Sequence, residues 1–381
     1  MAVTDVSSQL ERGNMKKKRK IKFDISKILS KKCRWMFIIG MRSNGKSYEV
    51  KFDAISRAYH EGKKIAYVRR WDTDIKAKAV ASYFDDMKQA SNGYKAIEDI
   101  TGGEWEGITA YQGYLYFYRY DDNGKQVRSK NDIGRYLAVN MGEHYKSQTF
   151  IGYGTLIYEE VLTNKIYVTD EPHMLMNIVS TIFRDEDDDV RIYLVANTIS
   201  RVSPYISEWG LNNIPNQKPD TIDVYHLKRD DGTVVDFAVQ NTEVIETKSK
   251  LFFGNSQKQI QGGEWETKDM PKLEKPLEYY GHIYDILVDY DNFKFRLMLL
   301  CDEDNGGLTV YIYPYNGKKK FNRVVTDKYS TDPLRTPYID PKLSKAEQMI
   351  VDCFRKGKVA FSDNLTAADF ISLTKNYRMG V

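Results

Sequence analysis

The chain has 381 residues, a length that suggests two or three domains and leaves enough residues for buried cores. Its composition, 41% hydrophobic and 29% charged, is that of an ordinary globular protein, and no apolar run is long enough for a membrane-spanning helix. Three isolated cysteines and five scattered histidines argue against a disulfide framework or a zinc site. The net charge of +4 is too small to indicate a polyanionic partner by itself. The N-terminus lacks the apolar core of a secretory signal, so we expect a protein that is not secreted.

Charge is distributed unevenly along the chain. Lys16–Lys22 reads KKKRKIK, Lys318–Lys320 forms a second basic cluster, and Asp185–Asp189 reads DEDDD. We expect residues 1–22 to be a flexible basic segment. Each basic run is either a solvated surface or a contact with nucleic-acid phosphates, and the sequence leaves both readings open.

After the basic segment, the pattern predicts an α/β core. The apolar runs Arg34–Gly40 and Lys64–Arg70 predict buried strands, and the apolar spacing within Ser47–His60 predicts a helix between them. A second helix is expected over Asp72–Ala90, with Asp72 as its cap. Strand, helix and strand in series favour a parallel sheet.

The pattern changes over residues 113–140, where the hairpin signal Asp121–Gly124 predicts an antiparallel insertion. The parallel pattern then resumes with a strand at Gly154–Glu160, a helix at Glu171–Arg184 and a strand at Val190–Asn197. These elements continue the α/β core.

A further hairpin is expected at Asp230–Gly232, after which the composition shifts. Three alternating runs beyond residue 279 predict an antiparallel meander, and helices are expected over about 344–356 and 367–375. The predicted domains are a basic segment (1–22), an α/β domain (23–245), a linker or lid (246–275) and a C-terminal α/β domain (276–381).

The strongest motif is GMRSNGKS, which satisfies G-x-x-x-x-G-K-[ST] and joins a predicted strand to a predicted helix. Its glycines let backbone N–H groups approach phosphate oxygens, and the helix N-terminus adds its positive dipole end. Lys46 would neutralise the β- and γ-phosphates, and the Ser47 hydroxyl would bind Mg²⁺. The motif thus predicts an ATP–Mg²⁺ site formed by Gly40, Met41, Arg42, Ser43, Asn44, Gly45, Lys46, Ser47 and Tyr48.

Polar residues end two of the predicted strands. Glu159 and Glu160 close the run LIYEE, and we assign Glu159 to the metal, through a bridging water, and Glu160 to the activation of water as general base. Asn197 ends the next strand, where a polar side chain can sense the γ-phosphate. The alternatives are an exposed carboxylate pair and an ordinary turn asparagine.

Arg184 stands at the end of a predicted helix. By itself it is either a cation that stabilises the helix dipole or a finger that enters the site of a neighbouring subunit.

The strings FIIGMRSNGKSY, IAYVRRWD, TLIYEEV and STIFRDEDDDVRIYLVANTISRVSPY together resemble the DNA-packaging (encapsidation) ATPases of small short-tailed bacteriophages, the prohead-RNA-type packaging motors. The resemblance covers about Phe23–Tyr205 and continues more weakly to the C-terminus. It implies an additional-strand P-loop ATPase domain with a central, mostly parallel sheet, a small linker or lid domain, and a C-terminal ribonuclease-H-like domain without nuclease activity.

The resemblance also assigns roles to individual residues. It makes Arg184 the trans-acting arginine and Lys146 a second basic residue of the subunit interface at the nucleotide, and it matches Glu160 to the catalytic glutamate. Glu159 stands where the family has aspartate. Trp71 and Asp72 stand where the family can carry a lysine, which puts a basic trans contact there in doubt.

An active nuclease of the ribonuclease-H type needs carboxylates that converge on two metals. Asp285 and Asp289 share a strand face but lie about 13 Å apart, and Asp302–Asp304 fall in a polar turn. We therefore expect a non-cleaving C-terminal domain that binds nucleic acid, with Lys318–Lys320 facing the phosphates.

The resulting hypothesis is an ATP-driven translocase that packages double-stranded DNA into a preformed capsid. The partners it implies are double-stranded DNA, the capsid portal or connector, a packaging RNA and further copies in a homopentameric ring, in the host cytoplasm and away from membranes. Two alternatives remain: another P-loop nucleic-acid motor, such as a helicase or a terminase with active nuclease, and a non-catalytic, nucleotide-gated nucleic-acid-binding protein of capsid assembly.

Overall fold

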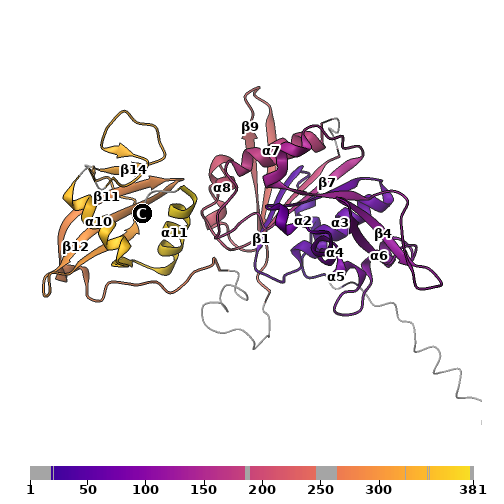
Figure 1. Ribbon diagram of the computed structural model, residues 1–381, viewed down its shortest axis with the longest axis horizontal. Coiled ribbons are helices and arrows are strands. Elements are labelled where there is room, and N and C mark those ends of the chain that lie inside the picture. The colour runs from indigo at the N-terminus through magenta and orange to yellow at the C-terminus, as the bar shows by residue number, and fades with distance from the viewer. Residues whose placement is uncertain are drawn as a thin grey trace, which may run out of the picture.

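The computed structural model describes residues 19, 21–184, 189–245, 264–321, 323–340, 342 and 344–377. Most of the predicted basic segment, residues 185–188 of the acidic run and residues 246–263 of the predicted linker lie outside the described residues. The described residues form two sheets, one of ten strands and one of six. Figure 1 shows the second sheet, with α10 and α11, to one side of the first. No described helix is long and apolar enough to cross a membrane.

The first sheet is mostly parallel. Its strands are β1 (Trp35–Gly40), β2 (Lys64–Arg69), β3 (Gly107–Tyr111), β4 (Tyr114–Tyr120), β5 (Gln126–Arg128), β6 (Gly134–Ala138), β7 (Tyr153–Glu159), β8 (Arg191–Asn197), β9 (Thr221–Lys228) and β10 (Val234–Asn241). They are ordered β3-β4-β6-β2-β7-β8-β1-β10-β9, with β5 on β4, and the strands from β6 to β10 in this order run parallel. Because β8 lies between β1 and β7, one strand separates the phosphate-loop strand from the strand that carries the glutamates. This is the additional-strand arrangement that the family resemblance implied.

Apolar cores on both faces hold this sheet. The central strands are buried along nearly their whole length, which explains their continuous apolar runs. One face is covered by α2 (Ser26–Leu29), α3 (Lys46–His60), α4 (Ala77–Tyr83), α5 (Asp85–Lys88) and α6 (Ala96–Ile100). The other is covered by η3 (Val139–Tyr145), α7 (Glu171–Ile182), α8 (Pro204–Glu208) and η4 (Ile214–Asn216).

The single helix predicted over Asp72–Ala90 is wrong. The segment forms η2 (Asp72–Asp74), then α4 and α5, and no side chain caps η2. The Asp72 carboxylate instead accepts a hydrogen bond from Asn140 Nδ2 at 3.0 Å. The helix breaks at Phe84, and the Phe84 side chain packs in the core between the two short helices. Tertiary contacts have therefore overridden local helix propensity here.

The second sheet is the expected meander with further strands at both edges. Its strands are β11 (Tyr280–Tyr290), β12 (Phe293–Asp302), β13 (Leu308–Pro314), β14 (Val324–Thr326), β15 (Arg335–Thr336) and β16 (Val359–Phe361). The order is β15-β14-β11-β12-β13-β16, with β11, β12 and β13 antiparallel and β14 parallel to both β11 and β15. Five of these strands therefore follow the order 3-2-1-4-5 of a ribonuclease-H-like sheet. The accompanying helices are η5 (Leu277–Tyr279), α10 (Lys345–Arg355) and α11 (Asn364–Tyr377).

Candidate active site

The loop between β1 and α3 folds as the glycine motif requires. Gly45 has φ +95° directly before the first helical residue, a conformation that strains other residues. A Cβ atom on Gly40 would lie 1.8 Å from Thr242 Oγ1, so only glycine fits at the end of β1. The loop forms one wall of a cleft of about 1020 Å³ at the carboxyl edge of the sheet.

Lys46 is the first residue of α3, and its amine lies against this loop. Its side chain is nearly buried, with 4% of the residue exposed. Its amine donates to four oxygens, namely those of Gly40 (3.1 Å) and Met41 (2.6 Å) and the Oδ1 atoms of Asn44 (3.1 Å) and Asn197 (3.2 Å). Burial lowers the pKa of Lys46 to about 8, although the charge of Glu159 opposes the shift. Phosphate oxygens are stronger partners for an ammonium group than neutral carbonyls, so the amine is poised to bind them.

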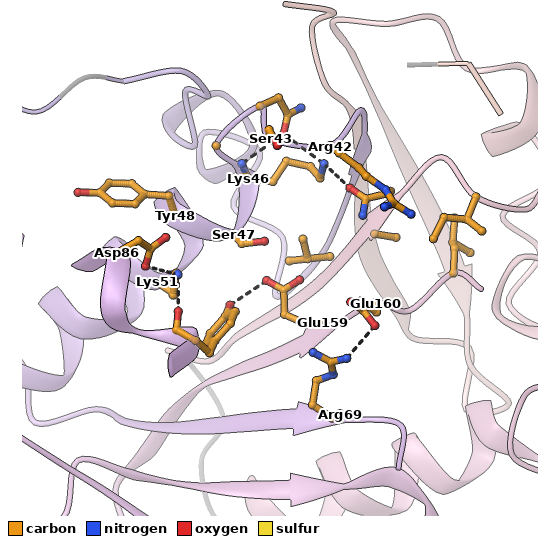
Figure 2. Close-up of a pocket in the computed structure, with 18 of the residues that line it drawn as sticks. Arg42, Ser43, Lys46, Ser47, Tyr48, Lys51, Arg69, Asp86, Glu159 and Glu160 are labelled. Carbon is orange, nitrogen blue, oxygen red and sulfur yellow. Dashed lines mark hydrogen bonds and ion pairs between the residues drawn. The ribbon is translucent and has the colours of Figure 1, made fainter. Parts of the chain in front are cut away.

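Glu159 lies at the inner end of the cleft, close to Ser47 (Figure 2). It is the last residue of β7 and is 7% exposed. Its carboxylate accepts a hydrogen bond from the Tyr83 hydroxyl at 2.8 Å. Burial raises the pKa of this carboxyl group, and the hydroxyls of Ser47 and Tyr83, together with nearby lysines, counteract the rise.

The hydroxyl of Ser47 and the carboxylate of Glu159 fit a magnesium ion. Both supply the hard oxygen ligands that Mg²⁺ prefers, and both side chains line the cleft beside the loop. Among the described residues, no group of three or more His, Cys, Asp and Glu could hold a metal. Mg²⁺ does not need such a group when phosphates and waters complete its octahedron.

Glu160 turns away from Glu159. It has φ +60°, is exposed, and accepts a hydrogen bond from Arg69 Nη2 at 2.7 Å (Figure 2). Arg69 ends β2, the neighbour of β7 in the sheet. Both side chains line the cleft, so the expected general base lies at the site, but an ion pair holds it to one side.

Asn197 lies where the sequence placed it. It ends β8, pairs in register with Gly40 of the adjacent β1, and its Oδ1 accepts a hydrogen bond from the Lys46 amine. The side chain therefore joins the end of the inserted strand to the phosphate loop.

Arg184 is not part of this cleft. It is exposed just beyond α7, whose first residue, Glu171, bonds to Arg70 at the carboxyl edge of the sheet. Twelve helical residues span about 18 Å, which carries the end of α7 toward the opposite edge. Near that edge Arg57, in the last turn of α3, bonds to the backbone of Asp189. Arg184 can act on a nucleotide only if that nucleotide belongs to another subunit.

Lys146 is likewise outside the residues that line the cleft. It directly follows η3 and forms an ion pair with Glu143 at 2.7 Å, with both side chains exposed. The predicted site residues therefore divide into a group that the fold brings together and two cations, Arg184 and Lys146, that it does not.

Sequence reasoning missed three cleft residues: Arg69, Tyr83 and Lys51. Arg69 had a usable signal, because it ends a strand predicted to lie in the same parallel sheet as the glutamates. Tyr83 and Lys51 had none, because their contacts depend on how the broken helical segment after β2 packs against α3. Lys51 Nζ donates to the Tyr83 backbone oxygen at 2.6 Å.

The carboxylates of the second sheet are each paired with a cation. Asp285 contacts Arg296 (2.5 Å) and Lys319 (3.0 Å). Asp289 contacts Lys328 at 3.0 Å, and Asp302 contacts Lys275 at 2.9 Å. A metal ion could bind these carboxylates only by displacing the paired cations. Lys319, which we expected to face nucleic acid, has its amine on Asp285.

Comparison with known proteins supports the resemblance that the sequence motifs indicated. Residues 17–100 match a family described as Podovirus DNA encapsidation protein (Gp16). The DNA packaging protein of Bacillus phage phi29 is 26% identical over 268 residues, which cover 66% of this chain and 71% of that protein. The DNA packaging protein of Bacillus phage PZA is 26% identical over 178 residues, and this chain spans only 46% of its length.

Solved structures of packaging proteins are also similar. The Phi-28 gp11 DNA packaging motor has a TM-score of 0.47 and 17% identity, covering 95% of this chain and 99% of that chain. The N-terminal domain of the DNA packaging ATPase from bacteriophage phi29 has a TM-score of 0.44 and 22% identity, covering 61% of this chain and all (100%) of that chain. The family match and the phi29 and PZA relatives together confirm that this chain resembles bacteriophage DNA-packaging proteins.

Proposed function

We propose that this chain is the motor ATPase that drives double-stranded DNA into a preformed bacteriophage capsid. The observation that carries the proposal is the convergence of Lys46, Ser47 and Glu159 at the phosphate loop. The similarity to DNA packaging proteins of bacteriophages supplies the substrate and the setting.

The loop and its lysine would bind the triphosphate of ATP. The first residues of α3 line the cleft, where their backbone N–H groups would bind phosphate oxygens. The Lys46 amine would exchange the Gly40 and Met41 carbonyls for phosphate oxygens. Ser47 and Glu159 would hold Mg²⁺, Glu159 directly or through a water. When bound, the ion neutralises charge on the β- and γ-phosphates.

Glu160 would act as the general base for the attacking water. Its carboxylate lies in the cleft but is bound to Arg69, so it must leave this partner before it can accept a proton near the phosphate. Asn197 would report the loss of the γ-phosphate, because it shares the Lys46 amine with the loop.

Completion of the site would require a second copy of the chain. Arg184 would reach the γ-phosphate of a neighbouring subunit and stabilise transition-state charge, with Lys146 as a second basic contact at the same interface. We further propose the homopentameric ring, docked on the capsid portal, and the packaging RNA that the resemblance implies. Contact with the DNA would be made through the phosphate backbone, because a packaging motor must act on every sequence.

The C-terminal domain would bind nucleic acid without cleaving it. Asp285, Asp289 and Asp302 each form an ion pair with a lysine or arginine that a bound metal would have to displace, and these ion pairs support this role over that of a terminase with active nuclease.

The direct test measures ATP hydrolysis and DNA packaging by the full chain with purified capsids. We expect Lys46→Ala to abolish nucleotide binding and Glu160→Gln to abolish turnover, whereas Lys125→Ala, a lysine in the exposed β4–β5 turn, should behave as the native chain. If neither cleft variant loses turnover, the ATPase proposal fails.

A further inference from the structure

A glutamate at the end of β7 raises a geometric question. Its side chain has several rotatable bonds, so the carboxylate needs a contact to hold it in one position beside Ser47. The structure provides such a contact in the Tyr83 hydroxyl, 2.8 Å from Glu159 Oε1. We propose that Tyr83 is a positioning residue that fixes the Glu159 carboxylate at the magnesium site. This inference rests on the proposed function.

Tyr83 is itself held in place by its surroundings. Its ring stacks on Tyr67, with centroids 4.5 Å apart, and meets the edge of Phe84 at 5.0 Å. These ring contacts fix the direction of the hydroxyl without involving Glu159. A tyrosine held in this way can impose its geometry on a carboxylate, whereas a freely rotating one would follow it.

The same helix positions both side chains near the carboxylate. Ser47 and Lys51 are four residues apart on α3 and so lie on one face of the helix. Ser47 lies beside Glu159 in the cleft (Figure 2). Lys51 is buried and donates to the Tyr83 backbone oxygen at 2.6 Å and to Asp86 at 2.5 Å, with its amine 4.4 Å from the centre of the Tyr83 ring. The helix that follows the phosphate loop therefore carries Ser47 and, through Lys51, also holds the segment that carries Tyr83.

The contact is matched to glutamate and not to aspartate. Shortening the side chain by one carbon would withdraw the carboxylate by about 1.5 Å, well beyond hydrogen-bond distance of Tyr83 if the backbone stays in place. A role in positioning thus predicts that Tyr83 matters only while a glutamate occupies position 159. If Tyr83 had a purely structural role, its substitution would reduce stability by the same amount whichever residue occupies position 159.

The experiment uses the full chain with Tyr83→Phe, which keeps the stacked ring and removes only the hydroxyl. The measured quantities are the Mg²⁺ concentration that half-saturates binding of a fluorescent ATP analogue, Mn²⁺ bound with nucleotide by electron paramagnetic resonance, and ATP turnover. We expect the required Mg²⁺ concentration to rise about tenfold, the loss typical of one hydrogen bond to a charged group.

A matched control is Tyr193→Phe. Tyr193 is a core tyrosine on β8 whose hydroxyl donates to the Asp53 carboxylate at 2.7 Å, outside the residues that line the cleft. It should lose stability comparably and leave the Mg²⁺ requirement unchanged. An unchanged requirement in Tyr83→Phe, or an equal rise in the control, would overturn the inference.

The second arm repeats Tyr83→Phe in a Glu159→Asp background. We expect no further change in Mg²⁺ requirement there, and an undiminished tenfold rise would also overturn the inference. Failure of the proposed function looks different, because Lys46→Ala would then bind Mg²⁺-nucleotide like the native chain.

Discussion

Both sheets carry carboxylates on buried strands, but the two sheets neutralise them in different ways. In the first sheet Glu159 accepts a hydrogen bond from the Tyr83 hydroxyl, and Arg69, at the end of the neighbouring strand β2, is bound to Glu160 instead. In the second sheet every carboxylate discussed above has a lysine or arginine within ion-pair distance. An ion pair compensates the charge of a carboxylate, whereas a hydrogen bond from a neutral hydroxyl group does not. The difference underlies our proposal that metal-assisted chemistry takes place at the first sheet.

The largest expected difference between the two sheets concerns turnover. Glu160→Gln removes the proposed base but keeps the size of the side chain, so ATP turnover should fall at least about 100-fold while nucleotide affinity stays near the native value. Asp302→Asn, which removes the carboxylate that Lys275 neutralises in the second sheet, should leave turnover unchanged. Steady-state hydrolysis and equilibrium nucleotide binding measure the two effects. A comparable loss of turnover in both variants would show that the contrast between the sheets is mistaken.

For the free energy of unfolding, we expect the larger loss from a variant in the C-terminal domain. Glu347 on α10 and Arg323 form an ion pair at 3.2 Å, with 2% and 1% of their side chains exposed. Glu347→Gln leaves a buried guanidinium without its counter-charge and should reduce the free energy of unfolding by about 3 kcal/mol. Glu159→Gln should instead preserve or raise stability, because the neutral amide avoids the burial penalty that raises the pKa of Glu159.

The sign of this second effect can be checked against pH. A carboxyl group whose pKa is raised on folding binds its proton more tightly in the folded chain, so its burial penalty is present at pH 7 and falls as pH is lowered. The stability difference between Glu159→Gln and the native chain should therefore shrink as the pH approaches the ordinary carboxyl value of 4.5 from above. Calorimetric unfolding of both chains at several pH values measures it. A difference that grows as pH falls would contradict the assignment.

The sequence predicted the parts of this site that depend on local order along the chain. The glycine loop, the glutamates and Asn197 each lie at the end of a predicted parallel strand, and parallel strands bring these ends to one edge. Tyr83 could not be predicted, because its position depends on a break between two short helices that side-chain packing decides. Arg184 is the opposite case. Its motif was recognisable in the sequence, but the fold of its own chain places it far from the cleft.

Arg184 can be tested by mixing two inactive proteins. In a ring, a subunit with Arg184→Ala still supplies Glu160 to its own site, and a neighbour with Glu160→Gln still supplies Arg184. In an equal mixture about a quarter of the sites then have both groups, so turnover should return to that order of the native rate. Each variant alone is the control. If the mixtures stay inactive although native-like rings form, Arg184 does not act across the interface.

The smallest expected effect concerns the proton on Lys46. Burial lowers the pKa of this amine to about 8, whereas a bound triphosphate favours the charged form and raises the pKa again. Near pH 8, nucleotide binding should therefore take up roughly half a proton, and the uptake should vanish well below this pH, where the amine is already charged. Calorimetric titrations in two buffers of different ionisation enthalpy measure the uptake. Lys46→Arg is the matched control, because a guanidinium keeps its charge at this pH and should take up none. Equal uptake by both chains would show that another group takes up the proton. The proposal that the Lys46 amine leaves the loop carbonyls to bind phosphate would then lose its support.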